Sequence, residues 1–317
     1  MGQAVVRRVD HVNVRVSDPE PLFSLFAERF ELPVVWPVTS FPSFANGSVA
    51  LGNMTLEPTS YGGSSDRGTA AELFSICFEP EPVAAAAAEL KRRGISHSPP
   101  VPYVGTWPRS ASTELFHPED QTAGKQPLWT WIFLGGFLGD ATMARRWSNP
   151  IYGNRLAAWA IGRGAGNPSL GPRLAAGMAP RRAYPFFCQW EAFDIEASRE
   201  QAAGELRHRG GGPLGLVGVR EIIAATVDLE RETPLWRKLL EPAPETEPGR
   251  WELGGGPGVR LVAGEADGVE ALVCNVSSLE RAASFLRASD MLGVSSTAEA
   301  RIAPEALGGL DIRLVEA

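Results

Sequence analysis

The chain has 317 residues and a mass of 34.0 kDa, a length typical of two domains or one large one. Hydrophobic residues make up 44% and charged residues 21%, which excludes a wholly disordered protein. Thirty basic residues against 37 acidic ones give a net charge of −7, which argues against a nucleic-acid-binding protein because such proteins carry a basic patch.

The chain shows no signal for secretion or membrane insertion. Its start is too polar for a signal peptide, and no run approaches the roughly 18 apolar residues of a membrane span. We therefore expect a cytoplasmic protein that does not act at a membrane. The cysteines, Cys77, Cys188 and Cys274, are too widely spaced for a disulfide framework or a CxxC zinc site. Each lies in an apolar run, where a free thiol usually behaves as a small hydrophobic side chain.

Four similar units follow one another along the chain. Residues 9–22 and 70–83 are both strand-like runs that end in an acid followed by Pro, Glu and Pro. Residues 219–229 and 269–279 contain similar runs, and Asp18, Asp228 and Ser278 are suited to cap the helices that follow. A helical pattern and short strand candidates, separated by Gly, Pro and Asn, come after each run. The pattern predicts an α+β fold made of four βαβββ units.

The units predict two domains with a linker between them. Residues 1–191 hold two units and a long insertion at 138–184, and residues 219–317 hold the other two. Residues 192–218 contain one helical stretch and a glycine-rich end, which is typical of a linker. Long insertions are usually lids, binding loops or partner contacts.

These units resemble the vicinal oxygen chelate superfamily of glyoxalases, bleomycin-resistance proteins and extradiol dioxygenases. The segments DHVNVRVSD and LGNMTLEPTS, at the two ends of the first unit, carry the resemblance, and PFFCQWE at 185–191 is similar to the glyoxalase-like subgroup. The resemblance implies that the units pair into two cup-shaped mixed β-sheets with flanking helices. It also implies a divalent metal ion in a cup, bound by the first and last strands of each unit.

Carried over position by position, the resemblance implies four metal ligands in the first half. His11 and Glu57 would come from the first and last strands of unit one, and Glu72 and Glu191 from those of unit two. One histidine with several glutamates suits zinc, nickel, manganese or iron.

Strand alternation agrees with this assignment, because side chains point to one face at every second residue. His11 and Asn13 share a polar face opposite a row of valines, so Asn13 is expected to line the substrate pocket in the cup. By the same rule, Glu72 shares its face with Phe74 and Ile76. Trp129, Trp131 and Trp190 could be core residues or an aromatic wall for a hydrophobic substrate, and the sequence leaves both open.

The second half departs from the ligand pattern. Glu221 occupies the position of His11, Val262 or a neighbour occupies that of Glu57, and no histidine follows His208. We expect no metal cup there and interpret residues 219–317 as a degenerate domain that supports stability or assembly.

Our first hypothesis is a metal-dependent, glyoxalase-like enzyme for a small carbonyl-containing substrate. It would act as an isomerase, lyase or epimerase through a metal-stabilised enediolate, with Glu57 or Glu191 as the base. The first alternative is a metal-free protein that binds a small molecule, as resistance proteins do. The second alternative is an extradiol-type dioxygenase, which the single histidine disfavours because such sites use two histidines and one carboxylate. Self-association into a homodimer stays open.

Overall fold

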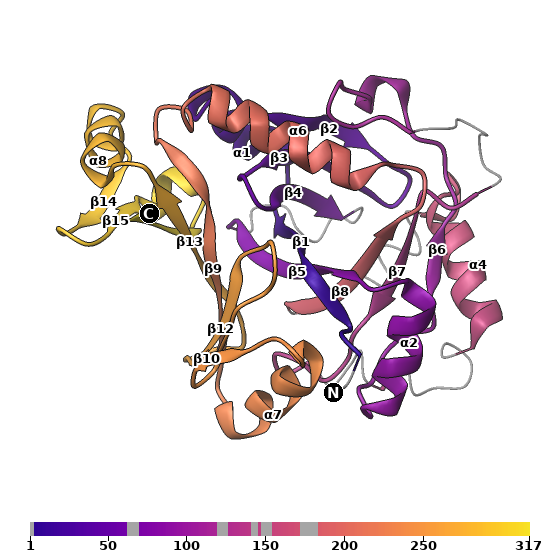
Figure 1. Ribbon diagram of the computed structural model, residues 1–317. Coiled ribbons are helices and arrows are strands. Elements are labelled where there is room, and N and C mark those ends of the chain that lie inside the picture. The colour runs from indigo at the N-terminus through magenta and orange to yellow at the C-terminus, as the bar shows by residue number, and fades with distance from the viewer. Residues whose placement is uncertain (1–2, 62–69, 119–125, 141–144, 147–153, 172–182) are drawn as a thin grey trace.

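The structure is a computed structural model that describes residues 3–61, 70–118, 126–140, 145–146, 154–171 and 183–317. Its strands form two mixed sheets of eight strands each, flanked by helices, which confirms the predicted α+β fold (Figure 1). Much of the predicted insertion at 138–184 lies outside the described residues; within it, helix α4 (Arg155–Ala165) is described. None of the helices in the described residues has the length and apolar character that crossing a membrane requires.

The first sheet has the strand order β2-β3-β4-β1-β5-β8-β7-β6. Two βαβββ units meet at its centre, where β1 and β5 pair antiparallel, and each unit's last strand runs parallel to its first. The elements of the first half are β1 (Val6–Arg15), α1 (Pro19–Ser24), β2 (Val34–Ser40), β3 (Phe44–Ala50), β4 (Thr55–Tyr61), β5 (Glu72–Pro80), α2 (Val83–Arg92), β6 (Val101–Tyr103), β7 (Trp129–Phe133) and β8 (Tyr184–Trp190).

The second sheet repeats this plan with the order β10-β11-β12-β9-β13-β16-β15-β14. Helix α6 (Ile195–His208) precedes it in the chain. The elements of the second half are β9 (Leu216–Thr226), α7 (Leu229–Leu240), β10 (Glu245–Glu247), β11 (Arg250–Trp251), β12 (Gly258–Ala263), β13 (Gly268–Val276), α8 (Leu279–Ala288), β14 (Leu292–Ser295), β15 (Ala300–Ile302) and β16 (Asp311–Glu316).

Local sequence signals explain where the helices begin. Asp18, Asp228 and Ser278 each accept a hydrogen bond from a backbone N–H in the first turn of α1, α7 and α8, as predicted. Pro19 occupies the first turn of α1, where its missing N–H costs nothing.

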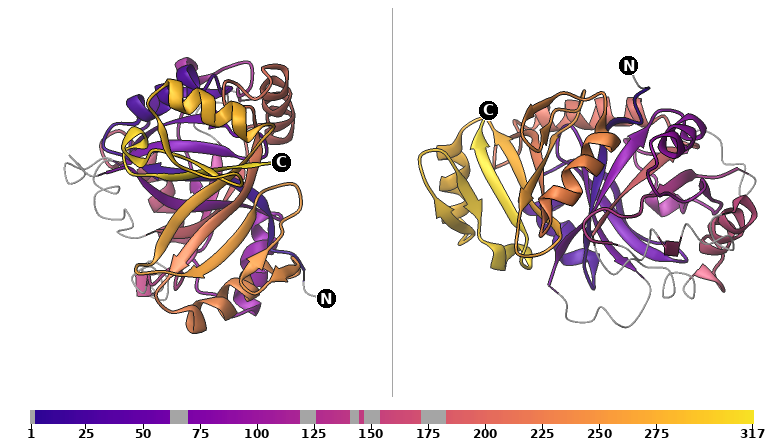
Figure 2. Two further views of the ribbon diagram at one scale, coloured as in Figure 1. Left: turned by 90° about the vertical axis from the view of Figure 1, so that its left-hand side faces the viewer. Right: turned by 90° about the horizontal axis from the view of Figure 1, so that it is seen from below.

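One apolar core joins the two halves. It contains Val12 and Val14 of β1 together with Ile222 of β9, Trp236 of α7 and Leu286 of α8. The two sheets lie side by side in both views that show them, with the second half beside β1 and β5 (Figures 1 and 2). Neither sheet therefore buries its apolar face alone.

The turn at Gly52 and Asn53, between β3 and β4, also joins the two halves. The Asn53 side chain donates a hydrogen bond to the carbonyl of Val219 at 2.8 Å and accepts one from its N–H at 2.9 Å. Gly52 has a φ of +92°, and a Cβ there would lie 2.6 Å from the carbonyl oxygen of Val217. The turn thus docks its backbone and one amide side chain against β9.

Candidate functional site

The polar face of β1 is separated from the core by strand alternation. Val12 and Val14 point into the shared apolar core, whereas His11 and Asn13 line a pocket on the opposite face. This division follows the predicted pattern, and it places polar side chains on the face that curls into a cup.

A β-bulge adds a carboxylate that alternation would place elsewhere. Val9 pairs with Phe78 and His11 with Cys77, so that Asp10 is an extra residue in β1. The bulge brings Asp10 to the side of His11, and its Oδ2 lies 2.8 Å from Nδ1 of the imidazole. Bulges re-aim side chains in this way next to functional sites.

His11 and Glu57 meet at the polar end of the pocket. Nδ1 of His11 lies 3.6 Å from Oε1 of Glu57, and both side chains are buried. Oε2 of Glu57 accepts hydrogen bonds from the side-chain amides of Asn13 at 3.2 Å and Asn46 at 3.0 Å. Oε1 has no hydrogen-bond partner, although it is buried. An orphaned carboxylate oxygen is costly and indicates a missing partner, such as a cation or a ligand.

Burial and mutual attraction shape the protonation of this pair. Burial raises the pKa of Glu57 to about 7, against the opposing effect of His11. Burial acts to lower the pKa of His11, but Glu57 and Asp10 together raise it above its ordinary value. The pKa of Glu57 therefore lies near neutral pH, and that of His11 lies above its ordinary value.

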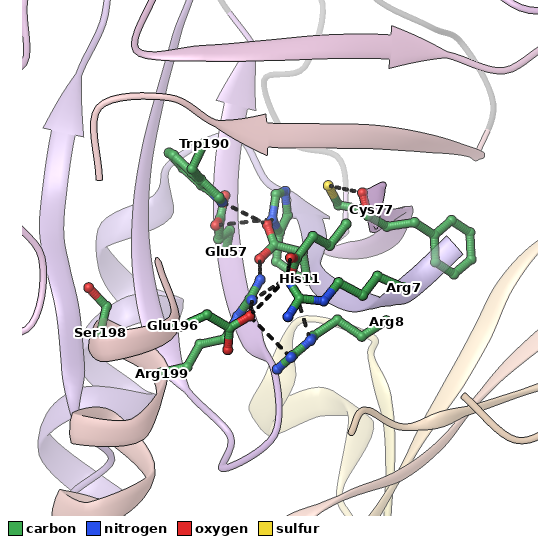
Figure 3. Close-up of polar contacts among 12 residues, drawn as sticks. Arg7, Arg8, His11, Glu57, Cys77, Trp190, Glu196, Ser198 and Arg199 are labelled. Atoms are coloured by element: carbon green, nitrogen blue, oxygen red, sulfur yellow. Dashed lines mark hydrogen bonds and ion pairs between the residues drawn. The ribbon is translucent and has the colours of Figure 1, made fainter. Parts of the chain in front are cut away.

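Asp10 connects the pair to helix α6. Its carboxylate accepts hydrogen bonds from Nε1 of Trp190 at 3.1 Å and from the guanidinium of Arg199, which also pairs with Glu79 (Figure 3). Burial acts to raise the pKa of Asp10, but Arg199 and His11 hold that pKa well below its usual range. Asp10 is thus a fixed negative charge that orients the imidazole.

The two cysteines of the first half lie at the same place. Cys77 on β5 is the cross-strand partner of His11, and one donor atom each from Asp10, His11 and Cys77 lie within 4.8 Å of one another. Cys188 on β8 lines the pocket, and the thiol of Cys77 donates a hydrogen bond to the carbonyl of Phe78 at 3.8 Å. Burial raises the pKa of both thiols.

The pocket itself has a volume of about 160 Å³ and mostly apolar walls. An apolar cavity of roughly 150 Å³ can hold a benzene-sized molecule. His11, Asn13, Asn46 and Glu57 form part of its polar lining. The aromatic lining residues are Trp36, Phe41, Phe44, Tyr61, Trp107, Trp129, Trp131, Phe133, Tyr184, Phe186 and Trp190.

The structure brings together most, but not all, of the residues that the sequence singled out. His11, Glu57 and Asn13 converge, and Trp129, Trp131 and Trp190 line the same pocket. Glu72 and Glu191 do not line it, and the described residues that sequence reasoning missed at this site include Asp10, Asn46, Cys77 and Cys188.

A second β-bulge explains why the prediction of which β5 side chains face the cup was wrong. Pairing with β1 shifts between Leu73 and Ser75, so that Phe74 is an extra residue. Beyond the bulge Ile76 packs in the shared core, and Cys77 faces the cup. Alternation counted from Glu72 had placed Ile76 on the cup face. No signal in the printed sequence marks this bulge.

Glu72 and Glu191 have other partners. Glu72 begins β5 and forms an ion pair with Arg15 at the partly exposed end of the sheet. Glu191 follows the last residue of β8, is exposed, and accepts hydrogen bonds from Thr130 at 3.1 Å and Gln189 at 3.0 Å. The β8 side chains that line the pocket are Tyr184, Phe186, Cys188 and Trp190.

The second sheet carries a different set at the equivalent positions. Glu221 stands where His11 stands, as the sequence predicted, because each follows a bulge in the first strand. Arg260 lies two residues beyond the β12 partner of Glu221, as Glu57 lies two residues beyond the β4 partner of His11. The equivalent of Glu57 is thus Arg260, two residues before the Val262 that the sequence analysis named, and its Nη1 lies 3.8 Å from Oε1 of Glu221.

The cysteine positions of the second sheet are apolar. Val273 pairs with Glu221, and Val315 lies two residues beyond the β16 partner of Val273. Both valines belong to a small apolar cluster with Ile223 and Ala271. Among the described residues, the only cluster of potential metal ligands is that of Asp10, His11 and Cys77 in the first sheet.

Comparisons with known proteins find similarity in structure alone. No protein-family model matches the chain, and no curated protein matches it in sequence. Homoprotocatechuate 2,3-dioxygenase from Brevibacterium fuscum, in a complex with 3,4-dihydroxyphenylacetate, is 10% identical; the match covers 100% of this chain and 82% of that one, with a TM-score of 0.53. The same enzyme from Arthrobacter globiformis is 11% identical over 100% of this chain and 81% of that one, with a TM-score of 0.52.

A third similar structure is a hypothetical protein from Staphylococcus aureus, 10% identical, with 98% of this chain and 99% of that one covered and a TM-score of 0.52. Together with the strand order, these matches show that the chain has the vicinal oxygen chelate fold. Sequence identities near 10% establish the fold alone, so the chemistry has to be argued from the residues of the site.

Proposed function

We propose that this protein is a metal-dependent enzyme that acts on a small, largely apolar substrate bearing adjacent oxygen atoms. The observation that carries the proposal is the buried, unpartnered Oε1 of Glu57, which lies 3.6 Å from Nδ1 of His11. Two donors bound to one ion at roughly 2.0–2.2 Å are separated by about 3.4 Å at a tetrahedral angle, so the pair fits a shared divalent ion.

Each residue around the ion site would have a distinct task. A divalent ion held by His11 and Glu57 would supply Lewis-acid catalysis to a carbonyl-containing substrate. Asn13 and Asn46 hold Oε2 of Glu57 and so fix the carboxylate. Ion binding through Nδ1 of His11 would replace the 2.8 Å contact of that nitrogen with Asp10, whose carboxylate stays held by Trp190 and Arg199. Such outer partners commonly tune metal ligands.

Glu57 is the residue proposed to move the proton in isomerase, lyase or epimerase chemistry beside a carbonyl. Its carboxylate lines the pocket, so it can reach a bound substrate, accept a proton and return it. The aromatic walls exclude water and select a planar or hydrophobic substrate near the size of one ring. Glu191, the other base considered from the sequence, is exposed outside the pocket and is left out of the proposal.

A metal-free binding protein is the second candidate. The aromatic lining favours it, because such walls bind hydrophobic compounds without any catalytic group. Extradiol-type dioxygenation has less support, since His97, His117 and His208 are absent from the pocket lining and only one histidine is left for the ion.

Metal content and metal-dependent stability test the proposal. Protein purified without a histidine tag should contain close to one equivalent of a divalent metal by elemental analysis. Its melting temperature should rise with that metal over chelator, by a stabilisation of about 2.7 kcal/mol at a hundredfold excess over Kd. His11→Ala should lose the shift, while His208→Ala, which changes an exposed histidine, should keep it.

Two results would count against this assignment. If zinc, nickel, manganese and iron(II) all fail to shift the wild type, the binding-protein candidate replaces the enzyme. If added metal raises the melting temperature of His11→Ala as much as that of the wild type, the ion binds elsewhere.

A further inference from the structure

Two tryptophans of the pocket have indole N–H groups that the protein leaves without an acceptor. Nε1 of Trp107 and Nε1 of Trp129 are buried, and neither has a hydrogen-bond partner among the described residues. Both side chains line the pocket, and they are only 4% and 3% exposed. A buried indole N–H usually has an acceptor, because it lost its bond to water on folding. The two groups therefore indicate an acceptor that enters the pocket with a ligand.

Two other tryptophans of the same pocket show the ordinary arrangement. Nε1 of Trp36 donates a hydrogen bond to Oδ1 of Asn46 at 3.4 Å, and Asn46 in turn holds Glu57. Nε1 of Trp190 donates one to Oδ2 of Asp10 at 3.1 Å (Figure 3). These N–H groups belong to the polar end of the pocket, where protein acceptors satisfy them.

The indoles without an acceptor are connected to the polar end through the other two. The ring of Trp107 packs edge-on against that of Trp36, with centroids 5.7 Å apart, and the ring of Trp129 packs edge-on against that of Trp190, with centroids 5.5 Å apart. Both also pack against Phe41, at centroid distances of 5.6 and 6.0 Å. Trp107 and Trp129 thus form an outer pair of indoles, gathered around one phenyl ring of the pocket wall.

Packing fixes this outer pair before any ligand binds. The ring of Trp129 stacks on Tyr103, with centroids 4.3 Å apart and planes 5° from parallel. The ring of Trp107 contacts Phe116 at 5.3 Å and Phe193 at 5.0 Å. Close-packed rings of this kind are held in one orientation. Fixed donors give specificity, because a ligand that lacks an acceptor leaves them unsatisfied.

We infer that Trp107 and Trp129 form an acceptor-binding subsite, in which their indole N–H groups donate hydrogen bonds to oxygen atoms of the substrate. An indole nitrogen is a donor only, so these groups select an acceptor such as a carbonyl oxygen and offer nothing to a cation. The inference rests on the proposed function for the orientation of the substrate, whose adjacent oxygens would lie at His11 and Glu57. The substrate class is then a small aromatic compound with a further acceptor oxygen at its other end.

Benzaldehyde and styrene are the probes that test this inference, because they share size and shape and only benzaldehyde carries an acceptor oxygen. Their affinities for the full-length protein are measured in chelator by isothermal titration calorimetry. Trp107→Phe and Trp129→Phe each keep an aromatic ring and remove one N–H. Each should weaken the binding of benzaldehyde about fivefold more than that of styrene, which corresponds to one neutral hydrogen bond. Trp131→Phe, at a partly exposed tryptophan on the same strand as Trp129, is the matched control and should change both affinities by the same factor.

Nuclear magnetic resonance of the wild type gives a second measurement that does not depend on the folding of any variant. In protein with isotope-labelled tryptophan, the indole N–H signals of Trp107 and Trp129 should move further downfield with benzaldehyde than with styrene. The ring currents of the two probes are alike, so the difference reports the hydrogen bond. The signal of Trp36, whose N–H already has an acceptor in Asn46, should respond alike to both probes. Circular dichroism checks that the variants used for calorimetry are folded.

The outcomes separate the two proposals. Equal losses for the two probes in Trp107→Phe and Trp129→Phe, or equal movements of the two wild-type signals with both probes, would overturn the acceptor-binding subsite. The metal-dependent function would then still stand, because no metal is present in these measurements. If the probes behave as expected but no tested metal stabilises the wild type, the proposed function fails, and the subsite stands as part of the binding-protein candidate.

Discussion

Asp10 is the residue on which the arrangement of the site depends most. Its buried carboxylate accepts hydrogen bonds from Trp190 and Arg199 and contacts Nδ1 of His11. A buried carboxylate paired with a buried guanidinium leaves an uncompensated charge when one partner is removed. Asp10 therefore couples the position of the imidazole to helix α6.

Asp10→Asn is expected to lower the free energy of unfolding by about 2–3 kcal/mol, because it removes the charge from one of the two buried carboxylates that pair with Arg199 and leaves Glu79 as the other. Urea unfolding of the metal-free protein measures the change. The control is Glu205→Gln, which breaks the exposed 3.0 Å ion pair with Arg209 and should cost less than ~1 kcal/mol. Equal effects in the two variants would contradict the structural role given to Asp10.

The His11–Glu57 pair predicts an unusual dependence of stability on pH. The folded-state pKa of each group is raised, so each contributes stability that is present at low pH and lost as pH rises. For Glu57 the loss runs from its ordinary pKa of 4.5 to about 7. In chelator, the wild type should lose on the order of 2 kcal/mol relative to Glu57→Gln between pH 5 and pH 8.

Added metal should reverse that slope, since the ion binds deprotonated donors and its contribution grows with pH. Melting curves of wild type and Glu57→Gln at both pH values, with chelator and with zinc, provide the comparison. A difference between the variants that is independent of pH in chelator would show that Glu57 is ionised throughout.

At the scale of elements, helix α4 closes one side of the pocket through a close contact with β6. Ile161 and Ala165 of α4 line the pocket, and Gly162 between them approaches Pro102 so closely that a Cβ would lie 1.8 Å from its carbonyl oxygen. Only glycine permits this distance between helix and strand.

Gly162→Ala should therefore push α4 away from β6, at a cost of about 2 kcal/mol, and make the pocket tryptophans more accessible to acrylamide. Melting curves and fluorescence quenching report the two effects. Gly204→Ala in α6 is the matched control: its Cβ would meet only Arg207 at 3.8 Å, so it should stabilise the protein by about 0.5–1 kcal/mol. Unchanged quenching in Gly162→Ala would show that α4 does not close the pocket.

The sequence predicts elements better than it predicts which way their side chains point. Periodicity and capping residues are local, which is why the four βαβββ units and the helix starts at Asp18 and Ser278 could be predicted. The bulges at Asp10 and Phe74 arise from pairing between strands, and no local pattern records them. Each bulge shifts by one residue the alternation of side chains between the two faces of the strand. This shift is why the sequence analysis missed Asp10.

The same limit explains which of the predicted site residues lie at the pocket. The convergence of His11 and Glu57 could be predicted because their unit is short and free of insertions. Glu191 was chosen by its charge at a strand end, whereas geometry brings the uncharged Cys188 to the pocket. Apolar context made both thiols resemble core residues.

At the scale of the molecule, the shared core predicts that the two halves unfold together. Calorimetry should show a single transition, because residues of both sheets are buried in one apolar cluster. Asn53→Ala should lower the stability by about 1–3 kcal/mol by leaving the N–H and carbonyl of Val219 without partners, and should keep one transition. Two separate transitions in the wild type would refute the common core.

The ion pair of the second sheet makes the two cups respond differently to their surroundings. Glu221 in the second cup pairs with Arg250 at 3.2 Å and with Arg260 at 3.8 Å, and both guanidinium groups stay charged at any physiological pH, so this balance needs no ion from solution. The charge of the first cup, at Glu57 and His11, depends on protons and on whatever ions the environment supplies. Removal of metal would then increase amide hydrogen exchange in the first half of this duplicated fold. The second half would serve as an internal reference in the same measurement.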